Sequence, residues 1–230
     1  MSERATRRFI AVGMIVFIAF VAVRNLSAVI TDSWWFATVE QRGTWRRLSM
    51  YRYGVAAVTI VATFVLVWAN LAVADRARRR APLSDPTRSV RLNPRYAQLV
   101  EGRTRGLRLV TAAVVTAMAA PTLAGSWQEV ALFTHRRSFE GFNVSRLGAN
   151  AGFFVFTLPL LSAVTLWVIV AAVMTFAATA ASYYLNGSLD LSSRGRIVSR
   201  HAGIHLGALA ALVSAGVAAA LWWSRYSLAR

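Results

Sequence analysis

Apolar residues in this chain gather into long runs, and blocks of arginine separate the runs. The most extended run, Leu160 to Ala181, contains no charged residue and is long enough to cross a bilayer as one helix. Phenylalanines precede it, as is typical where a chain meets the membrane interface. Pro159 falls in or near the first turn, where a missing N–H costs nothing. The pattern therefore predicts a transmembrane helix that a turn at Asn186-Gly187 ends.

Five runs of this kind define the predicted architecture. We expect an all-α fold, a polytopic transmembrane helix bundle that forms a single domain over residues 1–230. The predicted membrane-spanning helices cover about residues 9–30, 53–74, 107–125, 158–181 and 202–223. Because charge is expelled from hydrocarbon, we expect the arginine-rich blocks at 75–106 and 186–200 to be loops.

The first run follows a short basic head, MSERATRR, and this arrangement also fits a secretory signal peptide. No convincing small-residue cleavage site follows the run, and the charge balance described below requires an uncleaved helix. We therefore expect residues 9–30 to remain as the first span.

An aromatic and basic connector, residues 31–53, separates the first two spans. Trp34 and Trp35 belong to an aromatic group of the kind found in belts at the membrane–water interface. An aromatic ligand pocket would use the same residues, but a position between two spans favours anchoring at the interface. We expect Trp34 and Trp35 to contact lipid or a partner protein.

The most basic segment of the chain, residues 75–108, follows the second span and contains ten arginines. It has no glycine-rich phosphate loop and no recognisable nucleic-acid module, so we expect no nucleic-acid partner. Anionic lipid headgroups or an acidic partner suit such a loop better. Its candidate contact residues are Arg76, Arg78, Arg79 and Arg80.

Small residues mark one face on each of two spans. In the third span the face consists of Ala112, Thr116, Ala119 and Ala120, which suits close helix packing inside a bundle. In the fifth span Gly203 and Gly207 form a Gly-x-x-x-Gly pattern, another close-packing signal. Trp222 and Trp223 close that span at the interface. We expect the two glycines and two tryptophans to contact lipid or other subunits.

Several phrases resemble one known family. GFFVFTLPL, then an apolar span, then SYYLNGSLDL resembles UPF0182, a family of large bacterial membrane proteins of unassigned function. TDSWWF after the first span and the Arg225-Tyr226 ending are similar to further phrases of that family. Asn150 in NAGFF stands where the family has an acidic residue. The resemblance implies an odd number of helices before two more helices and a large external domain. The chain ends at Arg230, which fits a short member, a truncated gene product or one piece of a split protein.

Composition supports a membrane protein. Hydrophobic residues make up 57% of the 230 positions, yet the formal net charge is +17. All 26 basic residues are arginine, which together with abundant alanine indicates a GC-rich bacterial genome. Cysteine is absent, so disulfides, thiolate metal sites and thiol nucleophiles are excluded.

Arginine counts predict the orientation. The head and the segments 75–108 and 186–200 hold three, ten and three arginines, sixteen in all. The alternating connectors, 31–52 and 126–152, hold four and three, seven in all. Because cytoplasmic loops carry the excess of basic residues, we expect a cytoplasmic N-terminus, an external C-terminus and insertion in the bacterial inner (plasma) membrane.

Candidate chemistry is sparse. His201 and His205 have the i, i+4 spacing of two metal ligands, but no glutamate follows the first histidine and no third ligand is evident. We expect both histidines to face lipid headgroups. No Gly-x-Ser-x-Gly elbow, Ser-x-x-Lys pair or paired carboxylates occur. The sequence therefore predicts no enzyme, no cofactor and no metal.

These observations lead to one functional hypothesis and one alternative. We expect a non-catalytic scaffold or subunit of a larger membrane complex, with lipids and other membrane subunits as partners. A carrier or channel for an ion or small solute is the alternative. Asn70, Trp68, several threonines and Ser214 are its polar candidates inside the spans, and none of them is ionisable.

Overall fold

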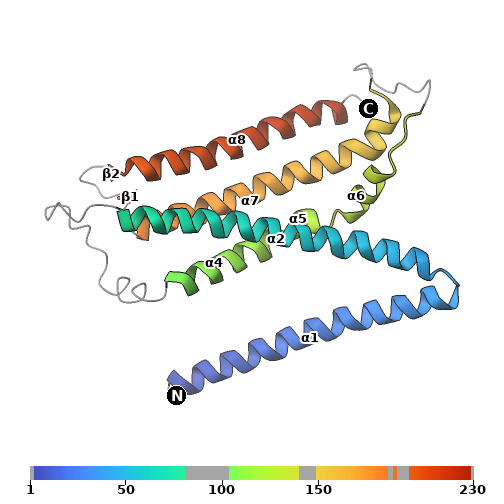
Figure 1. Ribbon diagram of the computed structural model, residues 1–230, viewed down its shortest axis with the longest axis horizontal. Helices are drawn as coiled ribbons and strands as arrows, with labels where there is room; N and C mark the ends of the chain where they lie inside the picture. Colours follow the sequence, from blue (N-terminus) through green and yellow to red (C-terminus); the bar gives the residue numbers. More distant parts are fainter. Residues whose placement is uncertain (1–2, 81–103, 140–148, 186–188, 191–196, 229–230) are drawn as a thin grey trace. The chain divides into compact units, whose positions relative to one another are not determined.

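The structure is a computed structural model that describes residues 3–80, 104–139, 149–185, 189–190 and 197–228 (Figure 1). The chain divides into two compact units, residues 1–50 and 51–230. The prediction of a single domain over residues 1–230 stays a prediction.

The first unit contains helix α1, Glu3–Thr38, and the beginning of α2, Arg42–Arg80. A tight turn ends α1. There, the Gln41 N–H donates to the Phe36 carbonyl over 2.8 Å and the Glu40 N–H donates to the Ala37 carbonyl over 3.2 Å. Glu40 has a φ of 59°, the left-handed conformation that this helix-capping motif requires. The chain therefore turns within three residues, 39–41, from one helix to the next.

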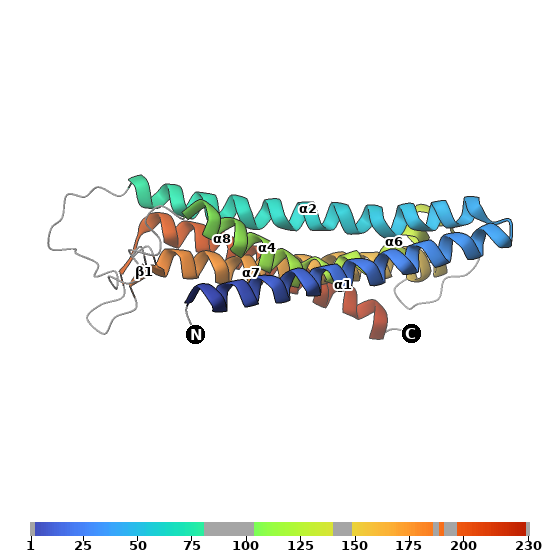
Figure 2. The same ribbon diagram turned by 90° about the horizontal axis from the view of Figure 1, so that it is seen from below.

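The described residues of the second unit form four long helical segments and several short elements (Figures 1 and 2). Its helices and strands are α2 from Tyr51 onward, α4 (Thr104–Ala119), α5 (Pro121–Ala124), α6 (Trp127–Thr134), η2 (Phe153–Thr157), α7 (Leu158–Leu185), β1 (Leu189–Asp190), β2 (Ile197–Val198) and α8 (Arg200–Leu228). Helices α7 and α8 run side by side in opposite directions and form the most extensive helix pair.

Apolar side chains of α2, α4 and α7 meet in the core. Val67 and Leu71 of α2 pack with Ala112 and Val115 of α4, and Met174 of α7 closes the cluster. The small-residue face predicted for the third span is confirmed, because every one of its members is buried: Ala112, Thr116, Ala119 and Ala120. Side chains this short let neighbouring helices approach closely.

A π-helical turn, η2, precedes α7. The Leu158 N–H donates to the Phe153 carbonyl, five residues back, which defines the wide turn. Pro159 lacks an N–H and its ring would clash with the carbonyl four residues earlier, that of Val155. A widened turn just before the proline relieves this conflict. The predicted place of Pro159, in the first turn of the helix, is confirmed.

A short β-hairpin joins α7 to α8. Its two strands are antiparallel, with Leu189 opposite Val198 and Asp190 opposite Ile197. Leu189 packs against a small cluster that Ala74, Tyr183 and Ala202 form. We call this side of the second unit the hairpin end.

The helical, multi-pass architecture predicted from the sequence is confirmed. Four described segments are long and apolar enough to cross a membrane: Arg42–Arg76, Arg105–Ala124, Phe153–Leu185 and Arg200–Tyr226. The fifth predicted span, residues 9–30, lies within α1, and many side chains of that span lie outside the described residues. The number of five spans therefore stays a prediction.

Two segments predicted as connectors, residues 31–53 and 126–152, are partly helical. Residues 31–38 continue α1, residues 42–52 belong to α2, and residues 127–134 form α6. The predicted basic loop at 75–106 is wrong at both edges, since α2 continues to Arg80 and α4 begins at Thr104. The predicted loop at 186–200 contains β1 and β2, and the Asn186-Gly187 turn lies outside the described residues. Arginine is a good helix former, so charge ends a membrane span without ending the helix.

Candidate functional site

Three helices meet in a hydrogen-bonded group at the hairpin end, which we call the polar junction: Asn70, Tyr183 and His205. The Tyr183 hydroxyl lies 2.9 Å from His205 Nδ1, and His205 Nε2 lies 2.8 Å from Asn70 Oδ1. Tyr183 is the largest fully buried side chain of the described residues, and its ring meets the imidazole edge-on. The polar junction therefore ties α2, α7 and α8 together through side chains alone.

Hydrogen-bond directions in the polar junction follow from the Asn70 amide. Its Nδ2 donates to the Leu66 carbonyl over 2.7 Å, which leaves Oδ1 as the acceptor that faces His205. His205 Nε2 therefore donates to Oδ1, and in a neutral imidazole Nδ1 then accepts from the Tyr183 hydroxyl. Both ring nitrogens of His205 therefore have a hydrogen-bond partner when the imidazole is neutral.

A second polar contact at the hairpin end joins α2 to α4. Arg108 Nη1 lies 3.4 Å from Asp75 Oδ2, and the two side chains are 18% and 23% exposed. The Arg108 guanidinium carbon lies 4.9 Å from the centroid of the Trp68 ring. Trp68 and Asp75 are seven residues apart and share a face of α2, whereas Asn70 lies on the other side. Helix α2 thus makes polar contacts in two directions.

The prediction for His205 is corrected by these contacts. We expected His201 and His205 to face lipid headgroups, but His205 turns inward to Tyr183 and Asn70, and His201 alone is exposed. Among the described residues, no group of three or more His, Cys, Asp or Glu side chains could hold a metal ion. The contacts of His205 were predicted wrongly, since the sequence does not show which residues from other helices face it.

Several threonine side chains are buried in the core of the second unit. Thr63 and Thr175 donate to carbonyls one turn back, over 2.7 and 2.6 Å, and Trp167 Nε1 donates to Thr63 Oγ1 over 3.0 Å. The hydroxyls of Thr116 and Thr179 are buried and have no hydrogen-bond partner within the described part of the chain. Thr179 lies one helical turn before Tyr183 on the same face of α7.

The opposite side of the second unit, which we call the aromatic end, is built from η2, α6 and the last turn of α8. Tyr226 packs against Phe153 and Phe154, with ring centroids 5.0 and 6.1 Å apart. The Arg225 guanidinium carbon lies 3.5 Å from the centroid of the Trp222 ring, and its Nη2 donates to the Tyr226 hydroxyl over 2.8 Å. The guanidinium of Arg225 therefore contacts two aromatic rings, those of Trp222 and Tyr226, at this end.

Asn150 has a structural role at the aromatic end. Its Oδ1 accepts from the Phe139 N–H over 3.1 Å, and its Nδ2 donates to the Phe139 carbonyl over 2.6 Å. Oδ1 also accepts from the Gly152 N–H over 2.9 Å. A carboxylate accepts hydrogen bonds only, so an aspartate at position 150 could not make the Nδ2 contact. The amide thus fixes the chain that leads into η2.

The two faces of α8 differ in their use of small residues. On the inner face, a Cβ added to Gly216 would come 2.7 Å from Ile169 Cγ1, so α7 approaches closely there. On the outer face, Gly203 and Gly207 are exposed, and a Cβ added to Gly207 would meet nothing within 4 Å. Together with these glycines, three exposed residues of similar size form the outer small-residue stripe: Gly203, Gly207, Ala211, Ser214 and Ala218.

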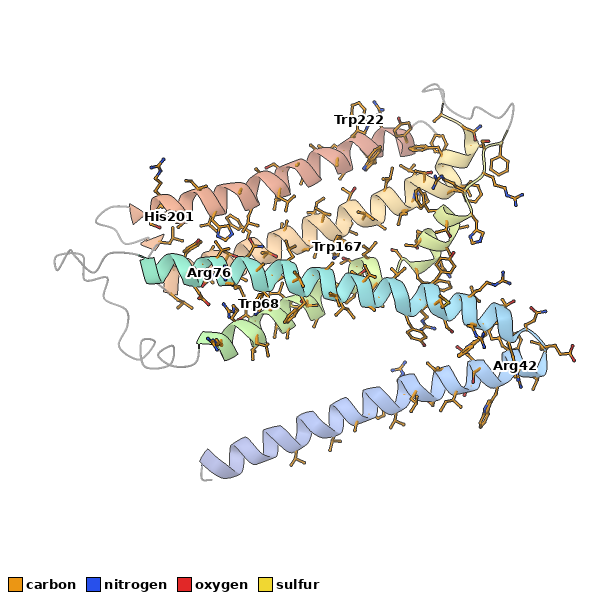
Figure 3. The ribbon with its side chains drawn as sticks, viewed as in Figure 1. Arg42, Trp68, Arg76, Trp167, His201 and Trp222 are labelled. Atoms are coloured by element: carbon orange, nitrogen blue, oxygen red, sulfur yellow. The ribbon has the colours of Figure 1, made fainter. Side chains whose placement is uncertain are left out.

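The other predicted contact residues lie on exposed surfaces or outside the described side chains (Figure 3). Trp34 and Trp35 are exposed in the first unit. Arg76, which Figure 3 labels, is exposed near the end of α2. Side chains of Arg78, Arg79 and Arg80 lie outside the described residues. Trp222 is exposed, and Trp223 is half-buried. Figure 3 shows His201 and Trp222 at opposite ends of α8.

Long apolar helices with interior polar contacts define the class of this chain, a multi-pass α-helical membrane protein. The profile of the uncharacterised protein family UPF0182 matches residues 9–230. The chain belongs to this bacterial family, as the resemblance of its phrases predicted.

Relatives occur in several bacteria. A UPF0182 protein of Rhodococcus opacus is 30% identical over 227 residues, which are 98% of this chain and 22% of the relative. One of Rhodococcus erythropolis is 25% identical over 227 residues, 98% of this chain and 23% of the relative. One of Mycobacterium tuberculosis is 31% identical over 205 residues, 89% of this chain and 20% of the relative. The chain thus spans about a fifth of the length of these curated relatives. No solved structure matches the chain.

Proposed function

We propose that the chain is a non-catalytic scaffold of a larger membrane complex and that the outer small-residue stripe of α8 binds a transmembrane helix of another membrane protein. The observation that carries the proposal is the open space at Gly207, on a face that the fold leaves exposed. Helix association in membranes relies on close backbone approach at small residues. Gly216 already provides such an approach to α7 inside the unit, so the two outer glycines are available to a partner.

The size of the relatives supports this proposal. In those proteins the matching region accompanies about four fifths of further sequence. We expect this membrane region to contact the rest of the polypeptide in those relatives, and such contacts require exposed surfaces that fit a neighbouring segment. Trp34, Trp35, Trp222 and Trp223 would anchor the scaffold at the membrane interfaces, and the arginines at 76–80 would contact anionic lipid.

A cross-linking experiment in the native membrane tests the partner. The chain has no cysteine, so one introduced cysteine reports one position. A thiol-attached photo-cross-linker at Ser214→Cys should give an adduct of defined mass with a different membrane protein. Val58→Cys, on an exposed position of α2, is the matched control and should give no such adduct.

Two glycine variants test whether formation of the adduct depends on the outer small-residue stripe. Gly207→Leu should abolish the adduct at Ser214→Cys and leave the free energy of unfolding nearly unchanged, because the added side chain meets open space. Gly216→Leu should instead lower the free energy of unfolding by about 2 kcal/mol through overpacking against Ile169. An adduct that survives Gly207→Leu, or one that contains two copies of this chain, would contradict the proposed partner.

A carrier or channel for an ion or small polar solute is the second candidate. It is favoured by the unpartnered hydroxyls of Thr116 and Thr179 and by His205, since buried polar groups usually bind water or solute. Purified protein in liposomes should then show ion flux that His205→Leu abolishes. The absence of flux with proton and sodium gradients would exclude these two ions as cargo.

We further propose that the chain resides in the bacterial inner membrane with its hairpin end toward the cytoplasm. The arginine count supports this orientation, as do Arg76, Arg105 and Arg200 at the hairpin end. Labelling of introduced cysteines from the outside of intact cells should modify Phe139→Cys and leave Arg200→Cys unmodified. The opposite pattern would reverse the proposed orientation.

A further inference from the structure

A guanidinium in the last turn of α8 has no anionic partner in the described part of the chain. Arg225 makes one hydrogen bond there, to the Tyr226 hydroxyl, and its Nε–H is buried without an acceptor. Arg108, the other arginine that lies over a tryptophan ring, has Asp75 at 3.4 Å. Arg225 therefore keeps its full charge available to a ligand.

The Arg225 guanidinium is also held in place. Its carbon lies 3.5 Å from the centroid of the Trp222 ring and 4.7 Å from that of Tyr226. Tyr226 is in turn packed against Phe153 and Phe154 of η2. Two rings of α8, one of them held by η2, thus orient a planar donor group before any ligand binds, which reduces the entropy lost on binding.

The position of Arg225 suggests the ligand. It lies at the end of the apolar segment Arg200–Tyr226, beside an exposed Trp222, where lipid headgroups meet a helical protein. The exposed side chains of Arg136 and Arg137 belong to the same end, since the Arg137 carbonyl adjoins Gly152 at the start of η2. Headgroup phosphates carry the negative charge at this depth, and guanidinium groups bind phosphate oxygens through paired hydrogen bonds.

We propose that Arg225, positioned by Trp222 and Tyr226, binds the phosphate of an anionic phospholipid headgroup at the aromatic end. The terminal Nη groups contact the phosphate oxygens, because Nε is buried. This site requires only that the chain is in a membrane and is independent of the partner proposed for the outer small-residue stripe. Free phosphate has the same oxygen chemistry, so the experiment includes it.

Native mass spectrometry of the detergent-purified chain tests the site. Titration with dioleoylphosphatidylglycerol should give a tighter complex than titration with dioleoylphosphatidylcholine. Arg225→Gln should weaken binding of phosphatidylglycerol by about tenfold, the effect of losing charge-assisted hydrogen bonds. Arg136→Gln is the matched control: Arg136 lies at the same end and over Phe133, yet its loss should change binding by less than about twofold.

Two further variants separate the ligand contact from the fold. Arg225→Lys keeps the charge but loses the planar fork, and Trp222→Leu removes the ring that orients the guanidinium. Both should weaken phosphatidylglycerol binding by about threefold while the lipid-free protein unfolds at nearly the wild-type temperature.

The outcomes decide the proposal. Unchanged binding by Arg225→Gln would overturn it, and so would equal losses in Arg225→Gln and Arg136→Gln, which would show diffuse surface charge. Displacement of phosphatidylglycerol by millimolar inorganic phosphate would overturn the lipid assignment and identify a site for free phosphate. Retention of the lipid in that competition supports the proposal.

Discussion

The hairpin end and the aromatic end of the second unit treat an arginine in opposite ways. At the hairpin end, Arg108 lies over Trp68 and pairs with Asp75, so the charge is compensated within the chain. At the aromatic end, Arg225 lies over Trp222 and Tyr226 and has no carboxylate partner in the described residues. Both cations contact aromatic rings, but only the first is neutralised. The Arg108 charge is thus compensated within the fold, whereas the Arg225 charge is available to the surroundings.

The polar junction deepens this contrast. At the hairpin end, each polar atom of the His205 ring has a partner from a different helix. At the aromatic end, Arg225 contacts the neighbouring Tyr226 and Asn150 contacts the Phe139 backbone, while one hydrogen bond, between Tyr51 and Thr134, joins two helices. Contacts between helices hold the fold together, whereas contacts within one segment orient a group locally. We therefore expect stability to depend on the first end and ligand binding on the second.

The largest stability effect should come from breaking the pair at the hairpin end. Asp75→Leu leaves the mostly buried Arg108 charge without compensation, which should lower the free energy of unfolding by about 2–3 kcal/mol. Thermal unfolding in detergent measures this loss. The double variant Asp75→Leu/Arg108→Leu should recover most of it, because two apolar side chains replace the pair. A double variant as unstable as the sum of the single variants would contradict the pairing.

An intermediate effect is expected from the polar junction. His205→Leu leaves the Tyr183 hydroxyl and Asn70 Oδ1 without their partner and should cost about 1–2 kcal/mol of unfolding free energy. Tyr183→Phe removes one hydrogen bond and should cost about 0.5–1 kcal/mol. In a double-mutant cycle the two losses should be less than additive. Additive losses would show that Tyr183 and His205 do not interact.

The smallest stability effect should come from the aromatic end. Arg225→Gln removes contacts with Trp222 and Tyr226, which are worth about 0.5–1 kcal/mol of unfolding free energy at a partly exposed site. The same thermal unfolding assay, without added lipid, measures this change. A loss as large as that of Asp75→Leu would mean that Arg225 is part of the structural core, and the contrast between the two ends would fail.

Much of the helical architecture could be predicted from the pattern of apolar residues. The charge-free run after Pro159 predicted α7, and the small residues around Ala112 predicted the buried face of α4. Both predictions rest on local physics: a bilayer sets the length of apolar sequence, and short side chains permit close packing. Helix ends were predicted poorly, because arginine and tryptophan outside the bilayer continue a helix as readily as they form a loop.

The functional residues were harder to predict. Gly203 and Gly207 were recognised from their spacing, but only the structure shows that they lie on the exposed face while Gly216 contacts α7. His205 was misplaced, since its partners come from positions 135 and 22 residues away in the chain. Arg225 was noted only within a family phrase. That no carboxylate of the described residues pairs with Arg225 depends on three-dimensional packing, which the order of residues alone does not state.

The π-helical turn η2 makes the aromatic end sensitive to chain length. A π turn holds one residue more than an α-helical turn of similar height. Deleting one residue from Phe153–Thr157 would restore α-helical geometry and rotate every earlier residue by about 100° around the axis of α7. Phe153 and Phe154 would then face away from Tyr226. A single-codon deletion at this turn, unlike one in an exposed loop, would therefore separate α8 from the segment that orients its last turn.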